Sequence, residues 1–255
     1  MKIDERIRVG VGREEIHMHI VRPTNGKRHP FVILSHGFSV DGTESHRLFI
    51  HLMNALEQVG CGSVTFDHRG IGYSDGEFED LTLTKEIEDL KAVIDCLYKK
   101  PFVDKANIGV LGQSHGSLVA VLALADDLRV KAFCLWGASI TPYDRYLRNL
   151  GTEILEKGKV CIPNKGFYLK RAFMDDLGRY DGLSCIERIF CPTILVHAGS
   201  DEKVPISEAK LAFERIKAPK EFVVIPGGNH SYKCQIELEK QAIEVTVGWF
   251  RKNLK

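Results

Sequence analysis

The sequence predicts one α/β domain built on a doubly wound, mostly parallel sheet, with an antiparallel hairpin at its N-terminal edge and a small inserted lid. Three observations predict this fold class. Short, continuous apolar runs alternate with segments whose apolar residues recur at helical spacing, as in sheets buried on both faces. The chain has 255 residues, 44% of them hydrophobic and 27% charged, which is ordinary for a globular domain. One long interval, 138–192, interrupts the alternation.

The predicted elements follow in chain order. Alternating residues over about 3–22 predict the antiparallel hairpin. Apolar residues recur at helical spacing over 87–98 and again over 236–250. Strands that alternate with helices imply crossovers and helices on both faces of the sheet. The expected buried strands are 31–35, 62–67, 108–112, 130–136, 193–197 and 221–225.

The interval 138–192 separates two strands that should be neighbours in the sheet. Loops longer than about 15 residues are usually functional or disordered in compact domains. We expect a small lid here, inserted into a core formed by residues 1–137 and 193–255; an ordinary crossover helix with long loops is the alternative. The interval is rich in aromatic residues, including Tyr143, Tyr146, Phe167, Tyr168, Phe173 and Tyr180.

Charge and composition exclude several classes of partner. Lys and Arg number 35 against 34 Asp and Glu, a net charge of +1, so we expect no nucleic-acid partner. No apolar run reaches the roughly 18 residues that span a membrane, and the first residues do not resemble a secretory signal. Seven cysteines without regular spacing indicate a reducing compartment, with the cytoplasm as the expected location. A homodimer stays open beside a monomer.

The pattern G-x-S-x-G occupies residues 112–116, between a predicted buried strand and a helical run. In that context it predicts a nucleophile elbow with Ser114 exposed at a tight turn. The flanking glycines remove Cβ atoms that would collide with the strand and the helix. A tight turn with a structural serine is the alternative.

Two further residues complete a candidate triad in chain order. Asp201 and His230 each follow one of the last two predicted strands, which is the order Ser, Asp, His of this type of site. We expect His230 to accept the serine proton and Asp201 to orient its ring. Glu202, which we expect to face solvent, is a rival for the acid. His197 and His115 are rivals for the base.

The same edge of the sheet predicts the donors of an oxyanion hole. The residues Ser35-His36-Gly37-Phe38 close a central strand, which would point the Phe38 amide at the site. The amide of His115, directly after the nucleophile, is the second expected donor. His36 is expected to tie the loop by hydrogen bonds rather than to transfer protons.

The glycine-rich stretch 67–76 superficially resembles a dinucleotide loop. Asp75 stands where the third glycine of that motif belongs, and the stretch follows the second central strand rather than opening the sheet. It is therefore interpreted as a structural turn in which Asp67, His68 and Arg69 hold loops together. The cysteines form no C-x-x-C pair and the histidines show no zinc-protease spacing, so we expect no metal and no cofactor.

These motifs together resemble the α/β-hydrolase superfamily over essentially the whole chain. The resemblance is carried by H-G-F at 36–38, D-x-R-G-x-G-x-S at 67–74, G-x-S-x-G at 112–116, D-x-x-V-P at 201–205 and His230. Within the superfamily, residues 36–38, residues 74–80 and the short lid are similar to the bacterial feruloyl (cinnamoyl) esterases. That resemblance implies hydrolysis of hydroxycinnamoyl esters.

The expected function is a serine carboxylesterase that acts on a small-molecule ester through an acyl-enzyme. A phenolic acyl group needs a polar partner at the far end of an apolar slot. Tyr143, Asp144, Tyr168 and Tyr180 are the lid residues of suitable chemistry. The alternatives are an acylaminoacyl-type serine peptidase or amidase on the same triad, and a non-catalytic binding protein of hydrolase fold.

Overall fold

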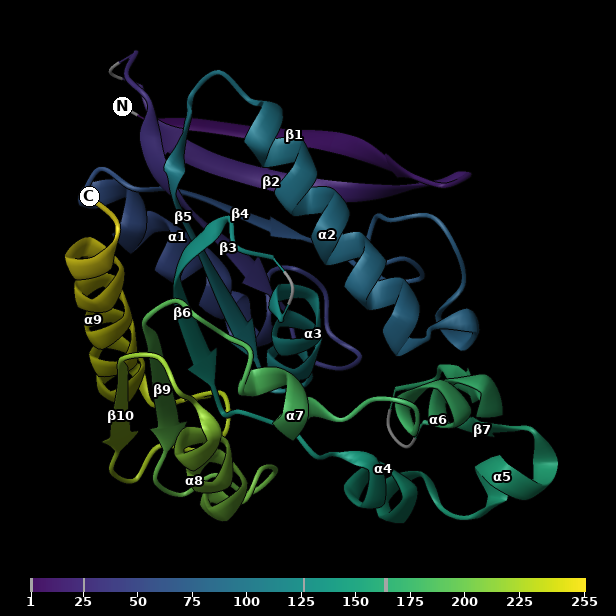
Figure 1. The fold of residues 1–255 in the computed structure, drawn as a ribbon. Coiled ribbons are helices and arrows are strands. Elements are labelled where there is room, and N and C mark those ends of the chain that lie inside the picture. Colours follow the sequence, from purple (N-terminus) through teal and green to yellow (C-terminus); the bar gives the residue numbers. More distant parts are fainter. Residues whose placement is uncertain (1, 25, 126, 163–164) are drawn as a thin grey trace.

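An eight-stranded sheet forms the centre of the molecule, in the order β1-β2-β4-β3-β5-β6-β9-β10 (Figure 1). It is seen in a computed structural model that describes residues 2–24, 26–125, 127–162 and 165–255. The strands are β1 (Lys2–Val11), β2 (Glu14–Pro23), β3 (His29–Ser35), β4 (Gly62–Phe66), β5 (Val103–Gln113), β6 (Val130–Trp136), β9 (Thr193–Ala198) and β10 (Lys220–Ile225).

The sheet is parallel except at its N-terminal edge. β1 pairs with β2 and β2 with β4 in antiparallel register, whereas every pairing from β4 to β10 is parallel. The predicted hairpin and the predicted mostly parallel sheet are both confirmed. Because the parallel strands share one direction, their carboxyl ends gather at one edge of the sheet, where ligands bind in open α/β sheets.

Helices cover both faces of the sheet, as predicted. α1 (Leu48–Gln58) and α9 (Ile236–Asn253) bury their apolar sides on one face. α2 (Leu83–Lys99), α3 (His115–Leu124) and α8 (Ile206–Arg215) pack on the other. Two short 3₁₀ turns, η1 (Ser45–Arg47) and η2 (Phe78–Asp80), lie in the loops between them.

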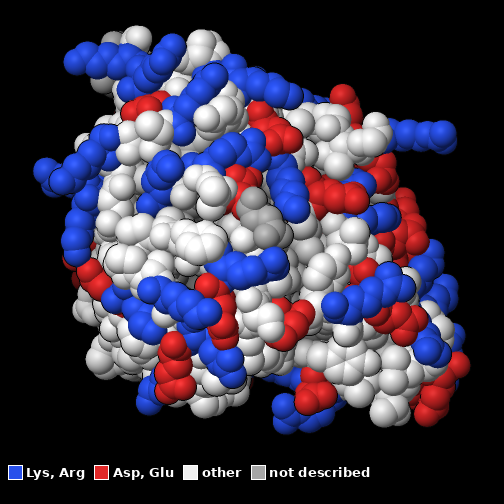
Figure 2. Space-filling view, in the orientation of Figure 1, with Lys and Arg blue, Asp and Glu red and all other residues white. Residues whose placement is uncertain are grey.

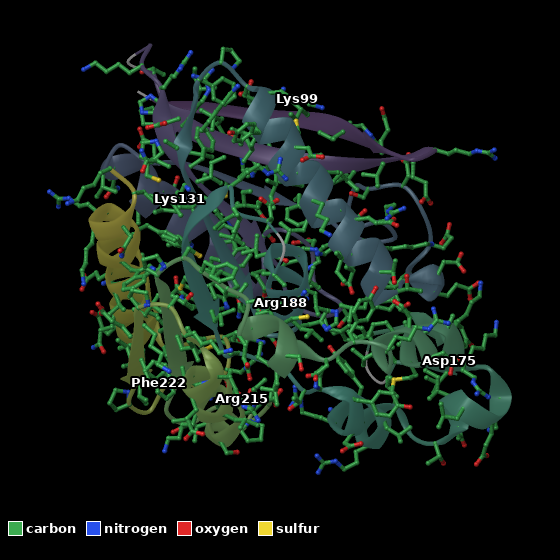
Figure 3. The ribbon with its side chains drawn as sticks, in the orientation of Figure 1. Lys99, Lys131, Asp175, Arg188, Arg215 and Phe222 are labelled. Atoms are coloured by element: carbon green, nitrogen blue, oxygen red, sulfur yellow. The ribbon has the colours of Figure 1, made fainter. Side chains whose placement is uncertain are left out.

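Within 138–192, the residues that the structure describes form four short helices and a two-stranded hairpin. In Figure 1, the elements α4, α5, β7 and α6 lie together beside the main sheet, whereas α7 lies next to α3. The labelled side chains of Figure 3 show the same division: Asp175, on α6, lies at the outer corner and Arg188, just after α7, near the middle of the molecule. The division into core and lid stays a prediction. The elements are α4 (Tyr143–Leu150), α5 (Glu153–Lys157), β7 (Lys159–Cys161), β8 (Tyr168–Lys170), α6 (Arg171–Leu177) and α7 (Gly182–Ile186).

The surface carries both signs of charge. On the face shown in Figure 2, Lys and Arg side chains are interspersed with Asp and Glu, in keeping with the net charge of +1. Among the residues that the structure describes, none of the helices combines the length and the apolar character needed to cross a membrane.

One aromatic contact fixes α9 against the centre of the sheet. The Phe250 side chain is 1% exposed. A Cβ atom on Gly109 of β5 would lie 2.6 Å from Phe250 Cε1, so the glycine makes room for the ring. The indole of Trp249 adds a hydrogen bond, donating from Nε1 to the carbonyl oxygen of Phe133 at 3.1 Å. The last helix is therefore anchored to the adjacent strands β5 and β6.

We predict that Phe250→Ala lowers the free energy of unfolding by about 3–5 kcal/mol, because it leaves a cavity against β5. Urea denaturation followed by circular dichroism measures the change. The matched control is Ile236→Ala on the same helix, where the side chain is 68% exposed and the expected change is within about 0.5 kcal/mol. Equal losses in the two variants would contradict the packing described here.

Candidate active site

Ser114 lies at the sharp turn between β5 and α3. Its φ of 53° and ψ of −118° fall outside the regions that non-glycine residues ordinarily adopt, at a cost of about 1–3 kcal/mol. A Cβ atom on Gly112 would lie 2.7 Å from Ser117 Cα, and one on Gly116 would lie 2.8 Å from the carbonyl carbon of Ser35. The two glycines thus allow the close backbone packing that the G-x-S-x-G pattern predicts.

Asp201 and His230 meet at the ends of two neighbouring strands. The loops after β9 and β10 carry them, and His230 Nδ1 donates a hydrogen bond to Asp201 Oδ2 at 2.8 Å. Asp201 Oδ1 accepts the amides of Lys203 and Val204 at 2.8 Å each. Burial alone would raise the pKa of Asp201, but the hydrogen bonds from His230 and the two amides outweigh it and hold that pKa below its ordinary value. A charged Asp201 therefore fixes the ring and leaves Nε2 free to exchange a proton.

Two of the three rivals from the sequence, Glu202 and His197, have other hydrogen-bond partners. Glu202 is exposed, as expected, but its Oε2 also accepts the backbone amide of His230 at 3.1 Å. His197 lies inside β9, its Nε2 donates to the carbonyl oxygen of Val204 at 3.1 Å, and burial lowers the pKa of its ring. His197 Nε2 also lies 3.8 Å from Asp201 Oδ2, beyond hydrogen-bond distance. Glu202 and His197 therefore lie beside the Asp201–His230 pair, and neither takes part in its hydrogen bond.

The amides of Phe38 and His115 are available to a ligand. Across the described part of the chain, neither donates to a protein acceptor, and the first N–H groups of a helix such as α3 have no partner inside it. The neighbouring amides are engaged: Ser114 donates to the carbonyl oxygen of Trp136 at 2.8 Å, and Gly37 donates to a carboxylate oxygen of Glu44. Their assignment as an oxyanion hole stays a prediction that this geometry allows.

Glu44 is a site residue that the sequence does not single out. Its side chain is buried, with the residue 7% exposed, and it lines the same cleft as Ser114 and His230. Its φ of 60° and ψ of 177° belong to a region that is essentially restricted to glycine and costs about 1–3 kcal/mol. It stands in a polar, turn-like stretch, which offers no pattern that would have marked it.

The side chain of His115 turns to α2 instead of the nucleophile. Its Nε2 lies 2.7 Å from Glu86 Oε2, and both side chains are almost fully buried. Burial alone would raise the pKa of Glu86, but the charge and hydrogen bond of His115 lower it. The imidazole also packs edge-on against Phe38 and Tyr146, with ring centroids 5.7 Å apart in each pair. This contact joins the elbow, the loop after β3 and α4.

A cleft of about 630 Å³ opens over Ser114. Its walls come from the elbow, α4 and the loops after β3, β6, β9 and β10. From α4 it receives Arg145, Tyr146, Arg148 and Asn149, which share one face of the helix. The lining residues are 37–40, 44, 45, 113, 114, 139, 145, 146, 148, 149, 201–205, 230 and 231.

The four lid residues expected at the substrate lie away from this cleft. Tyr143 and Asp144 begin α4 but are not in its lining. Tyr168 is 51% exposed, with Lys159 Nζ 4.9 Å from its ring centroid. The hydroxyl of Tyr180 lies 2.7 Å from Thr84 Oγ1 on α2. Tyr146 supplies the phenol at the cleft, because the docking of α4 decides which of its residues face inward.

The stretch after β4 holds loops together, as interpreted from the sequence. Asp67 accepts the amides of Gly42 at 2.7 Å and of Tyr73 at 2.9 Å. Arg69 donates from Nε to Asp89 Oδ1 at 2.6 Å. Within the residues described, His, Cys, Asp and Glu form no group of three or more that could hold a metal ion.

Two curated proteins are similar to most of this chain. An Escherichia coli protein from the traX-finO intergenic region is 24% identical over 91% of this chain and 94% of its own length. The 2,6-dihydropseudooxynicotine hydrolase of Paenarthrobacter nicotinovorans is 28% identical over 79% of this chain and 52% of its own length. This chain therefore spans about half of the second relative.

Among solved structures, Est1E from Butyrivibrio proteoclasticus with bound ferulic acid has the same fold. It superposes with a TM-score of 0.83 at 24% identity, covering 96% of this chain and 99% of Est1E. A family model described as serine aminopeptidase, S33, matches residues 26–175. Because this match covers more than half of the chain, the chain belongs to the serine aminopeptidase S33 family of α/β hydrolases.

Proposed function

We propose that this hydrolase is a serine carboxylesterase that works through a covalent acyl-enzyme on Ser114. The observation that carries the proposal is the 2.8 Å hydrogen bond from His230 to the buried Asp201, in the wall of the cleft that also contains Ser114. A serine hydroxyl is a weak nucleophile until a base removes its proton. An imidazole whose Nδ1 is committed to a carboxylate can do so through Nε2.

In the proposed reaction, Ser114 Oγ attacks the ester carbonyl carbon as its proton passes to His230. The carbonyl oxygen becomes an oxyanion held by the amides of Phe38 and His115. The bond to the alkoxy oxygen then breaks, and His230 gives its proton to the departing alcohol. Water then gives a proton to His230 and attacks the acyl carbon. The bond from that carbon to Ser114 Oγ breaks, His230 returns the proton to Ser114 Oγ, and the carboxylic acid leaves. Asp201 stays charged and stabilises the imidazolium.

We further propose hydroxycinnamoyl or other small aryl and short-acyl esters as substrates, with residues 138–192 serving as the lid. The fold shared with Est1E, which binds ferulic acid, and the phenol of Tyr146 in the cleft support this class. Amide hydrolysis is the second candidate, because the family description names an aminopeptidase.

We also propose a reducing compartment such as the cytoplasm as the location of the protein. All seven cysteines are free, which supports this proposal.

We predict that Ser114→Ala lowers kcat for an aryl ester by about 10⁴–10⁶ without loss of the fold, because only binding and the oxyanion hole remain. An ester hydrolysis assay measures the change in kcat, and the thermal unfolding temperature shows whether the fold is intact. A fluorophosphonate probe should label the wild-type protein and not the variant. A variant that keeps a tenth of the activity would exclude Ser114 as the nucleophile.

The adjacent carboxylates Asp201 and Glu202 should differ in their effect on kcat. Asp201→Asn removes the charge that orients His230 and should lower kcat by about 10⁴. Glu202→Gln keeps an acceptor for the His230 amide, so its loss should stay within about tenfold, the value of one modest hydrogen bond. Steady-state kinetics of the two variants decide; if their effects are exchanged, Glu202 is the acid.

Substrate choice is tested by two tyrosines with different surroundings. Tyr146→Phe should lower kcat/KM more for hydroxycinnamate methyl esters than for aliphatic esters, by about tenfold for each 1.4 kcal/mol of lost contact. Tyr180→Phe is the matched control, since that hydroxyl already bonds to Thr84. The corresponding amides are assayed beside these esters. Comparable turnover of amides and esters would favour the peptidase candidate. Equal losses on both ester classes would exclude a role of Tyr146 in selectivity.

A further inference from the structure

A buried carboxylate holds the loop that follows β3. Glu44 Oε1 accepts the backbone amide of Gly37, and Oε2 accepts the amide of Ser45 at 3.1 Å. A Cβ atom on Gly37 would lie 3.0 Å from Glu44 Oε1 and 3.6 Å from Ser114 Cβ. The carboxylate therefore approaches the loop from beside the nucleophile, through space that only a glycine leaves open.

The backbone of Glu44 is held in a conformation that its residue type disfavours. Its φ of 60° and ψ of 177° suit glycine, and His46 and Arg47 follow with φ of 44° and 67°. The strained segment is fixed by backbone bonds, with Glu44 N donating to the carbonyl oxygen of Asp41 at 3.0 Å. A glycine would fit this backbone more easily, so the presence of Glu44 indicates that its side chain is needed.

Both carboxylate oxygens of Glu44 accept a backbone amide, an arrangement that suits the charged form. Burial raises the pKa of Glu44 above its ordinary value, and the two amides, His230 and Lys203 offset only part of that rise. A hydrogen bond from an amide to a carboxylate is shorter and stronger than one to a neutral acceptor. The contact with Gly37 is consequently a stiff anchor for the loop.

The backbone of Gly37 has to be held in a single conformation for the next amide to have a fixed direction. Without a Cβ atom, Gly37 populates many φ and ψ values, and the direction of the next amide, that of Phe38, depends on them. Glu44 fixes the peptide unit before Gly37. The unit after it, which contains the Phe38 N–H, is fixed by His36, whose Nδ1 donates to the Gly37 carbonyl oxygen at 2.9 Å. Burial lowers the pKa of His36 to about 4, so its ring stays neutral with the proton on Nδ1.

We propose that Glu44 is a positioning residue of the oxyanion hole: its carboxylate holds the peptide unit before Gly37 while His36 holds the unit after it, and the Phe38 amide then points at the oxygen of the reacting carbonyl. This inference rests on the proposed function. It assigns Glu44 no contact with substrate. Its effect should fall on kcat, because the Phe38 amide is used most when negative charge develops on that oxygen.

The test compares three variants. Glu44→Gln keeps the shape but removes the charge, and Glu44→Gly removes the side chain while fitting the backbone, so it keeps the fold. Both should lower kcat by about 10- to 100-fold, less than the 10²–10³ of a deleted donor, with KM within about threefold. Asp41→Asn is the matched control: it lies in the same loop and accepts the Thr43 amide at 2.8 Å, so it should leave kcat within about twofold.

Two further readouts separate this role from the proposed function. The rate of fluorophosphonate labelling of Ser114 should fall in both Glu44 variants in parallel with kcat. The Gly37 amide proton should give a downfield NMR signal that moves upfield in Glu44→Gln. Equal labelling of wild type and Glu44 variants, or an equal loss in Asp41→Asn, overturns the positioning role alone. A wild-type protein that the probe does not label overturns the proposed function and this inference together.

Discussion

Close backbone packing around Ser114 is the constraint on which the rest of the site depends. The elbow is fixed on both sides within the sheet: Gly116 presses on the end of β3 at Ser35, and the Ser114 amide donates to Trp136 at the end of β6. Once Ser114 is set between these strands, the same turn places the amide of His115. Asp201 and His230 follow because β9 and β10 continue the sheet in parallel from β6. The site is thus a product of strand order as much as of individual side chains.

A single packed cluster links this elbow to the segment 138–192. The Phe38 ring lies 4.9 Å from that of Tyr146 on α4 and 5.4 Å from that of Phe173 on α6, measured between centroids. The His115 imidazole touches the same rings and is tied to α2 through Glu86. Apolar contacts and one buried hydrogen-bonded pair therefore hold the loop after β3, the elbow and α4 together. A change in α4 would reach the loop after β3 directly.

The sequence predicts what depends on local patterns and strand order. Ser114, Asp201 and His230 could be located because each follows an apolar run that predicts a strand. The sequence predicts a buried strand at 221–225, but β10 lies at the edge of the sheet and is only partly buried. The face of α4 could not be predicted, since residues 145, 146, 148 and 149 turn to the cleft only once the helix docks on Phe38 and Phe173. The role of Glu44 in the site could not be predicted for a different reason. Its contact with Gly37 depends on positive φ angles at non-glycine residues, which no residue preference predicts.

The two ends of the segment 138–192 lie on adjacent strands of the sheet. Ala138 follows β6 and Pro192 precedes β9, and the Phe133 amide of β6 donates to the carbonyl oxygen of Pro192 at 2.9 Å. Because the segment leaves and re-enters the sheet at neighbouring points, the entropic cost of bringing its ends together is small. Each doubling of its length adds only about 0.6 kcal/mol to that cost. A change in the length of the segment would therefore cost little at these two anchor points. Grafts of different length between these two anchor points would alter the walls of the cleft while the hydrogen-bonded strands beneath keep their register.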